Sequence, residues 1–154
     1  MKPRIYLDTS VIGGCFDSEF ELASRTLFEE IAQCRFIAVI SEIVEEEIAL
    51  APEKIRELIG NKQKIKFEVL SENEETVGLA EDYLKAGIVG KSYFDDCRHV
   101  AIASFYNVDL LVSWNFKHIV QFDKIRRFNA INMLHGYRQI EIRSPMEVIH
   151  YEKE

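Results

Sequence analysis

Short apolar runs, rich in β-branched and aromatic residues, alternate along this chain with longer segments whose apolar residues recur at helical spacing. The predicted strands are Arg4–Asp8, Phe36–Ile40, Ile65–Leu70 and Val108–Ser113, with two shorter ones at Ala130–Leu134 and Gln139–Arg143. Strands that alternate with helices favour a mostly parallel sheet with helices on both faces. We therefore expect an α/β fold, a three-layer α/β/α sandwich around a central, mostly parallel sheet.

Start signals mark several of the helices predicted between these strands. Ser41 is placed to cap a helix that runs to about Leu50, and Pro52 to open the next helix. Two later helices have capping-box spacing at their starts, in Ser71 with Glu74 and in Ser92 with Asp95. The remaining expectations are a helix over Glu21–Gln33, helix ends near Gly87 and at Tyr106, a loop over Gly87–Lys91 and a turn after Pro145.

A length of 154 residues predicts a single domain over residues 1–154. No apolar run approaches the ~20 residues that cross a membrane. The N-terminus enters a strand-like run without the layout of a signal peptide. Cys15, Cys34 and Cys97 are odd in number and widely spaced, which is typical of reduced thiols, so we expect a cytoplasmic protein. The four histidines do not pair with these cysteines at zinc-like spacing.

The formal net charge of −7 argues against nonspecific binding of nucleic acid by the whole surface. The charge is uneven, however. Residues 41–82 carry 12 acidic and 5 basic side chains, whereas residues 115–143 carry 6 basic and 2 acidic ones. One face is therefore expected to be acidic and another able to meet phosphate, although ordinary solvated faces would give the same counts.

Four polar residues occupy equivalent positions after the predicted strands, at the edge where parallel α/β folds bind ligands. Asp8 ends the first strand, and Glu47 lies on the helix after the second. Asp96 lies in the first turn of the helix through Tyr106, and Asn115 follows the fourth strand. Taken singly, each is as readily a capping, turn or solvent-facing residue. Together, their equivalent positions predict that they converge.

A cluster of carboxylates needs a neutralising charge, because like charges repel unless one is protonated or compensated. A hard divalent cation with oxygen ligands, Mg²⁺ or Mn²⁺, supplies that charge at neutral pH. Such a metal can activate a water and support displacement at phosphorus. His99 lies one turn from Asp95 and Asp96 and could orient either, but we favour the interpretation that it is a packed or surface residue.

Four segments, taken in order, resemble the motifs of PIN domains: Tyr6 to Ser10, Ser41 to Ile48, Asp95 to Ala103, and Leu111 to Asn115. The resemblance runs over nearly the whole chain, and within the family it is to proteins of the bacterial toxin type (VapC-like), the nuclease halves of toxin–antitoxin pairs. It implies a parallel-sheet α/β/α sandwich and Mg²⁺- or Mn²⁺-dependent endoribonuclease activity, with RNA as the substrate.

The resemblance also implies roles for individual residues. Asp8, Glu47 and Asp96 match the three family acids and would hold the metal. Glu46 takes the place of Glu47 if the register slips by one. The small hydroxyl residue that supports the first acid or contacts phosphate matches Thr9 or Ser10.

Asn115 departs from the family pattern, because many active members carry Asp there. The resemblance implies a fourth site residue with a neutral carbonyl oxygen, which would weaken a second metal more than the first and questions two-metal catalysis. Lys117, His118 and the pair Arg126–Arg127 are candidates for phosphate contacts. Trp114 and Phe116 can stack on bases or anchor the core, and the sequence favours neither interpretation.

Two functions remain open. The first is a metal-dependent endoribonuclease that acts as the toxin of a toxin–antitoxin pair, with an antitoxin protein as partner and, as the resemblance implies, a homodimeric state. The second is a PIN-fold binding module that has lost turnover and acts through a protein or RNA partner, which the neutral Asn115 and the acidic net charge favour.

Overall fold

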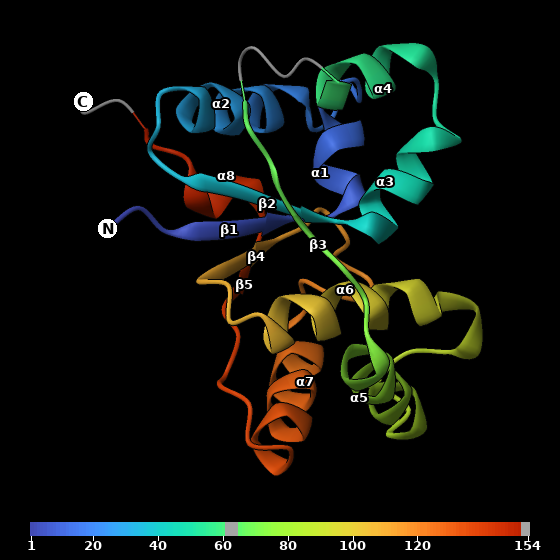
Figure 1. The fold of residues 1–154 in the computed structure, drawn as a ribbon. Coiled ribbons are helices and arrows are strands. Elements are labelled where there is room, and N and C mark those ends of the chain that lie inside the picture. Colours follow the sequence, from blue (N-terminus) through green and yellow to red (C-terminus); the bar gives the residue numbers. More distant parts are fainter. Residues whose placement is uncertain (61–64, 152–154) are drawn as a thin grey trace.

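Five parallel strands form one sheet in the order β3-β2-β1-β4-β5, in a computed structural model that describes residues 1–60 and 65–151 (Figure 1). The strands are β1 Arg4–Leu7, β2 Ile37–Ser41, β3 Glu68–Leu70, β4 Leu110–Val112 and β5 Ile142–Arg143. β1 lies at the centre, where Ile5 pairs with Ala38 of β2 and with Leu110 of β4. Because every pair is parallel, all strands end at the same edge of the sheet.

Helices cover both faces of this sheet (Figure 1). One layer contains α1 Thr9–Gly14, α2 Glu21–Ala32, α4 Glu53–Gly60 and α8 Pro145–Val148. The other contains α5 Glu74–Lys85, α6 Phe94–Phe105 and α7 Phe122–Leu134, and α6 is preceded by the short 3-10 helix η1 Lys91–Tyr93. The helix α3, Glu42–Ala49, follows β2 directly at the edge where the strands end.

The core lies on both sides of the two central strands. Ile5, Tyr6 and Leu7 of β1 and Leu111 and Val112 of β4 are fully buried. Side chains of successive strand residues point to opposite faces, so burial of the whole run requires helices above and below. The continuous apolar strands of the sequence are explained by this double cover.

The strand and helix predictions are largely confirmed, within one to three residues at most ends. Ser41 caps α3 as expected, since its Oγ accepts a hydrogen bond from the backbone N–H of Val44. The helix expected after Pro52 is α4, and the turn expected after Pro145 is α8. The third strand is shorter than predicted: β3 begins at Glu68, so residues 65–67 are outside it. The helix α1 was not predicted at all.

The strand predicted over Ala130–Leu134 is wrong, because these residues form the C-terminal end of α7. The buried face of α7 carries Asn132, which is fully buried and donates to Ser104 Oγ at 2.9 Å. Tyr83 donates to the Asn132 side-chain oxygen. A polar residue on the inner face interrupts the apolar periodicity that would have indicated a helix.

Both predicted capping boxes are also wrong. The cap of α5 is Asn73, whose side chain accepts from the Thr76 backbone N–H while the Thr76 hydroxyl accepts from the Asn73 backbone. α6 follows η1 without a side-chain cap, and Asp95 instead accepts a hydrogen bond from Arg98 at 2.9 Å. The cap of α5 lies two residues after the predicted one. At the start of α6, the 3-10 helix η1 stands where a side-chain cap was predicted.

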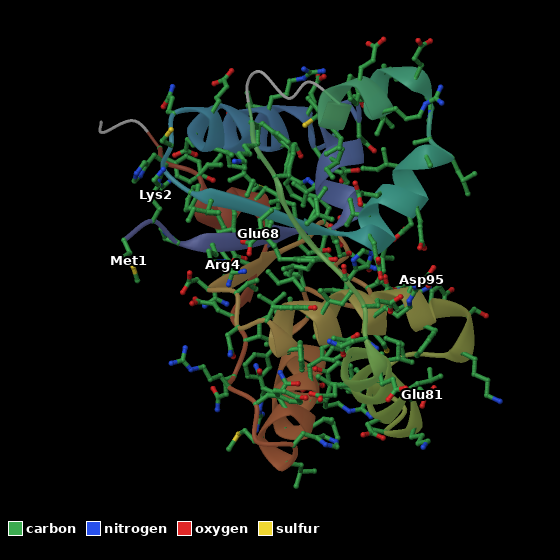
Figure 2. All side chains as sticks on the ribbon, viewed as in Figure 1. Met1, Lys2, Arg4, Glu68, Glu81 and Asp95 are labelled. Atoms are coloured by element: carbon green, nitrogen blue, oxygen red, sulfur yellow. The ribbon has the colours of Figure 1, made fainter. Side chains whose placement is uncertain are left out.

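Different charged residues lie at the two ends of the strands (Figure 2). At the amino ends, the Arg4 guanidinium makes a two-fold hydrogen-bonded ion pair with Glu68, at 2.8 and 3.0 Å, which ties β1 to β3 across β2. Asp95 lies at the other end, where the strands terminate (Figure 2). No helix among residues 1–60 and 65–151 is long and apolar enough to cross a membrane. All three cysteines are free thiols, and Cys34 alone of them is exposed.

Two adjacent glycines in α1 allow a test of the packing beneath the site. A Cβ on Gly14 would lie 2.6 Å from Ser24 Oγ and 2.7 Å from Trp114 Nε1, whereas a Cβ on Gly13 meets nothing within 4 Å. Gly14→Ala is expected to lower the free energy of unfolding by about 1–3 kcal/mol, because the core must shift. Gly13→Ala, the control, is expected to be neutral or stabilising by up to about 1 kcal/mol. Urea denaturation of both variants measures this, and equal effects would contradict the assigned contact.

Candidate functional site

The edge where the strands end brings together the four residues singled out in the sequence. Asp8 directly follows β1 and caps α1. Asp96 lies in the first turn of α6, Asn115 follows β4, and Glu47 lies on α3. Asn115 donates a hydrogen bond to Asp96. Glu47 is hydrogen-bonded to His99, which is in turn hydrogen-bonded to Tyr6 at the centre of β1.

Asp8 is 4% exposed, and donors surround its carboxylate. Oδ1 accepts from the Ser10 hydroxyl at 2.6 Å and from the Val11 backbone N–H at 3.3 Å. Oδ2 accepts from the Ser113 hydroxyl at 2.5 Å. Ser10 Oγ also accepts from the Trp114 backbone N–H at 2.9 Å, so the hydroxyl is held in place. Ser10 therefore has the contacts of a residue that orients Asp8.

Asp96 is held by two residues that follow β4. Asn115 Nδ2 donates to Oδ1 at 3.1 Å, and His118 Nδ1 lies 3.2 Å from Oδ2. Partial burial and the charges of Lys117 and Lys124 lower the pKa of His118, so it faces Asp96 as a neutral imidazole near pH 7. The 20% exposure of the Asp96 side chain leaves a path to solvent.

The orientation of Asn115 differs from the one implied by the family resemblance. Its carbonyl oxygen accepts from the backbone N–H of His118 at 2.9 Å. Because that backbone group can only donate, the amide nitrogen must face Asp96. An Asp at this position would bring a second negative charge about 3 Å from Asp96. Asn115 thus supplies a neutral donor to the acid beside it, and its carbonyl oxygen is already used.

His99 is 3% exposed and lies between Glu47 and the centre of the sheet. Nε2 is 2.7 Å from Glu47 Oε1, and Nδ1 is 2.6 Å from the Tyr6 hydroxyl. The Tyr6 hydroxyl in turn lies 2.7 Å from Ser41 Oγ, where β2 ends. His99 is packed, as the sequence favoured, and it also fixes the position of Glu47.

Glu47, not Glu46, faces the cluster. Glu46 is 66% exposed, and its nearest cation is Arg98 at 4.0 Å. Arg98 itself is bound by Glu72 and Asp95. The contact of Glu47 with His99 therefore separates the two candidates that the sequence left open.

The pKa values report how closely these charges lie. Burial, together with the charges of Asp8 and Glu47, raises the pKa of Asp96 to about 6 against the opposing effects of His99 and Asn115. Burial also raises the pKa of Asp8, against the charge of His99 and the hydrogen bonds from Ser10 and Ser113. Burial acts to lower the pKa of His99, but the hydrogen bond to Glu47 and the surrounding carboxylates outweigh it and raise that pKa. Protonation of His99 is thus favoured by the surrounding carboxylates.

Trp114 and Phe116 have different environments. Trp114 is 6% exposed, its Nε1 donates to Ser24 Oγ at 2.7 Å, and its ring stacks on Phe20 at 4.3 Å between centroids. It anchors the core, so the base-stacking interpretation is wrong for this residue. Phe116 is 49% exposed and touches Trp114 edge-on.

The basic residues proposed for phosphate contacts also differ in their surroundings. Lys117 is exposed, with Nζ 5.7 Å from the centre of the Tyr93 ring. Arg127 donates to the Ala86 carbonyl at 2.7 Å, so it ties α7 to the end of α5. Arg126 lies over Phe122, on the outer side of α7. Lys117 is therefore the one of these three that adjoins the site, because it directly precedes His118, whose Nδ1 lies 3.2 Å from Asp96 Oδ2.

Sequence reasoning missed the residues that hold the acids in place. Ser113 binds Asp8, and Tyr6, which is itself bound to Ser41, binds His99. Ser113 had a detectable signal, because it directly follows β4, the strand that pairs with β1. Tyr6 had none, since a tyrosine inside an apolar strand is usually a core residue.

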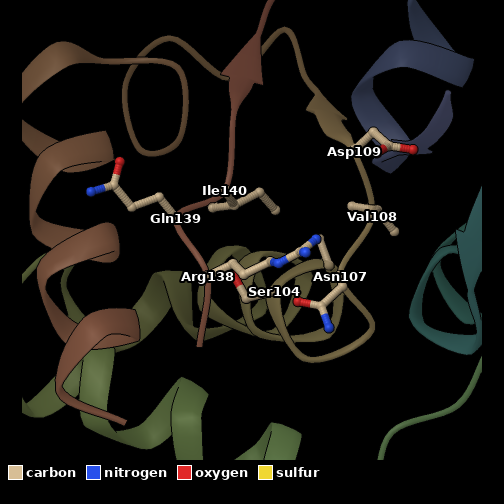
Figure 3. Close-up of a pocket in the computed structure, with 8 residues that line it drawn as sticks. Ser104, Asn107, Val108, Asp109, Arg138, Gln139 and Ile140 are labelled. Atoms are coloured by element: carbon tan, nitrogen blue, oxygen red, sulfur yellow. The ribbon is translucent and has the colours of Figure 1, made fainter. Parts of the chain in front are cut away.

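A separate hollow of about 140 Å³ lies at the opposite, amino end of β4 (Figure 3). Arg138, Asn107 and Gln139 line it, together with Ile140 and Val108 (Figure 3). It contains none of the clustered acids, so it is distinct from the site described here.

The donors of the cluster suit a hard cation, because three carboxylates supply oxygen ligands. Among residues 1–60 and 65–151, no three His, Cys, Asp or Glu side chains are already arranged to hold a metal. Both oxygens of Asp8 and Oδ1 of Asp96 accept hydrogen bonds, and His118 Nδ1 lies 3.2 Å from Asp96 Oδ2, while the side chain of Glu47 is 36% exposed. The hydroxyl of Thr9, beside Asp8, is buried without a partner in the described part of the chain. Donor chemistry and charge fit Mg²⁺ or Mn²⁺, with ligands bound directly or through water.

Solved structures share this architecture. VapBC2 from Rickettsia felis, bound to a DNA fragment from its promoter, matches with a TM-score of 0.60 at 15% identity, over 92% of this chain and 98% of that one. VapBC-1 from nontypeable Haemophilus influenzae matches with a TM-score of 0.59 at 16% identity, over 93% and 98%. The PIN domain endonuclease Utp24 gives a TM-score of 0.49 at 19% identity, over 92% and 84%. No protein-family model and no curated protein matches the sequence. The expected α/β/α sandwich of PIN type is confirmed.

In the absence of metal, the raised pKa of Asp96 predicts that the free energy of unfolding depends on pH. Because the folded pKa of about 6 exceeds the ordinary 3.8, the folded state binds more protons, and the free energy of unfolding falls as pH rises from about 4 to 6. Asp96→Asn removes this loss, so in EDTA the variant should gain up to about 3 kcal/mol on wild type between pH 4 and 7. Urea denaturation at both pH values measures the gain. A constant difference between the two proteins would contradict the assigned pKa.

Proposed function

We propose that this protein is a metal-dependent endoribonuclease that hydrolyses phosphodiester bonds of RNA at the edge where its strands end. The observation that carries the proposal is the convergence of Asp8, Glu47 and Asp96, from three separate elements, close enough that two of them raise the pKa of the third. Repulsion of this kind is destabilising, and it persists at sites whose function requires charge.

Asp8, Glu47 and Asp96 would hold Mg²⁺ or Mn²⁺, and the bound cation would lower the pKa of an attacking water and offset charge on the phosphate during displacement. The protein itself orients the ligands. Ser10 and Ser113 hold Asp8 in one orientation. His99 holds Glu47, and Tyr6 holds His99.

Each acid is therefore positioned before substrate arrives, which lowers the cost of organising the site during reaction. Lys117 is exposed beside these acids and is proposed to contact a phosphate. His118 was also proposed to contact phosphate, but its Nδ1 faces Asp96, and we propose that it orients this acid. Asn115 completes the site as a neutral donor, which favours one metal over two.

The proposal extends to partners. The similarity to VapBC structures supports an antitoxin protein as partner. A homodimeric state, which the family resemblance implied, and a cytoplasmic location, which the cysteine pattern favoured, are further parts of the proposal. A small reading frame directly upstream of this gene, with the features of an antitoxin, is the expected genomic arrangement.

A second function is a PIN-fold binding module without turnover. It is favoured by one observation, that both carboxylate oxygens of Asp8 accept hydrogen bonds from the protein. Calorimetric titration separates the two functions, because a module is expected to bind neither Mg²⁺ nor Mn²⁺ at millimolar concentrations. Binding with a dissociation constant in the micromolar range would support the nuclease.

Substitution of the acids tests the nuclease directly. Asp8→Asn and Asp96→Asn are each expected to lower the Mn²⁺-dependent cleavage rate by about 100-fold or more, because each removes a negative charge that would hold the cation, and the cation offsets charge on the reacting phosphate. A fluorophore-quencher RNA strand measures the rate. Asp95→Asn is the matched control, since Asp95 lies in the same turn, is 61% exposed and pairs with Arg98. Equal cleavage by wild type and Asp8→Asn would overturn the proposal.

Neighbouring glutamates on α3 provide a second matched comparison. Glu47→Gln is expected to weaken Mn²⁺ binding about tenfold or more, since Glu47 contacts His99 inside the cluster. Glu46→Gln should leave it within about twofold, since Glu46 faces solvent. Calorimetry on the purified variants measures both dissociation constants. A larger effect for Glu46→Gln would reassign the second acid.

A further inference from the structure

Tyr93 presents an aromatic ring beside the proposed metal site. It is the last residue of η1, directly before the α6 turn that carries Asp96. The residue is 41% exposed. Its ring packs against the imidazole of His118, with 3.9 Å between centroids and 33° between planes. Two short contacts therefore connect an exposed ring to Asp96, from Tyr93 to His118 and from His118 to the acid.

Cations flank the same ring. Lys117 Nζ lies 5.7 Å from the centre of the Tyr93 ring, within the range of a cation–π interaction. Lys91 begins η1 and is exposed two residues before Tyr93. An anionic ligand with flat, apolar faces suits both features.

We propose that Tyr93 is a stacking subsite for an unpaired base of single-stranded RNA, next to the phosphate that is cleaved. The proposal rests on the proposed function and adds the strand type that the site accepts. Bases in a duplex are stacked on one another and have no free face, whereas bases in a single strand stack on aromatic side chains. Lys117 and Lys91 would meet the phosphates on either side.

The role of Tyr93 differs from that of a surface aromatic that merely covers its neighbours. Phe122 on α7 offers the comparison, since it is 73% exposed and Arg126 lies over its ring at 5.4 Å. Phe122 has the same pairing of exposed ring and cation, but it has no contact with His118 or the acids. A general affinity of aromatic–cation pairs for RNA would involve both residues, and the proposed subsite involves Tyr93 alone.

The test measures binding apart from cleavage. Fluorescence anisotropy of a labelled eight-nucleotide RNA is recorded in Mg²⁺ with Asp8→Asn protein as the parent. Adding Tyr93→Leu, which keeps an apolar cover on His118, is expected to weaken binding about tenfold. Tyr93→Phe keeps the ring and should stay within about threefold, and Phe122→Leu should have no effect.

Abasic strands give a readout that a purely structural role would not change. Walking one abasic nucleotide along the strand should reveal one position where the parent loses about tenfold in affinity and where the Tyr93→Leu protein loses nothing further. Equal affinity of parent and Tyr93→Leu, or equal losses for Tyr93→Leu and Phe122→Leu, would overturn the subsite alone. Failure of the wild-type protein to bind or cleave the RNA in Mg²⁺ would overturn the proposed function and the subsite with it.

Discussion

The buried carboxylate of Asp8 is the constraint on which the rest of the site depends. A charge removed from water must be compensated within the protein, and here three hydrogen bonds and a nearby histidine provide that compensation. The Ser113 hydroxyl comes from the end of β4, so the same contact that satisfies Asp8 fixes two neighbouring strands at their ends. Backbone pairing aligns β1 with β4, and this side-chain contact completes the alignment.

Stability and function oppose each other at this edge. The charges of Asp8 and Glu47 raise the pKa of Asp96, and all three carboxylates raise that of His99, so without a bound cation the site holds excess negative charge. The apolar core beneath is completely buried and rigid, and it maintains the arrangement despite the repulsion. Asn115 reduces the repulsion, because it gives Asp96 a donor where a fourth carboxylate would add charge. A chain with Asp at this position would need its cation more.

Much of the fold could be predicted from the sequence, because alternating apolar runs and helical periodicity reflect burial on both faces of a parallel sheet. The acids could be placed at one edge for the same reason. The helix α7 was not predicted because its inner face carries the polar Asn132. The hydrogen-bond partner that allows Asn132 to be buried, Tyr83, is 49 residues away in the chain. The residues that hold the acids in place could not be predicted for a related reason. Whether Tyr6 reaches His99 depends on the packing of α6 against β1, which no local pattern encodes.

The contacts of His99 also determine when the site can exist. His99 joins Glu47 across 52 residues and Tyr6 across 93, while Ser113 joins Asp8 across 105. A ribosome delivers the amino end first, so β1, α2 and β2 emerge long before their partners. Until the segment from Asp96 to Asn115 has left the exit tunnel, Asp8 and Glu47 have nothing to assemble around. A nascent chain of this protein therefore stays unassembled at its site for most of its synthesis, in close proximity to the RNA that encodes it.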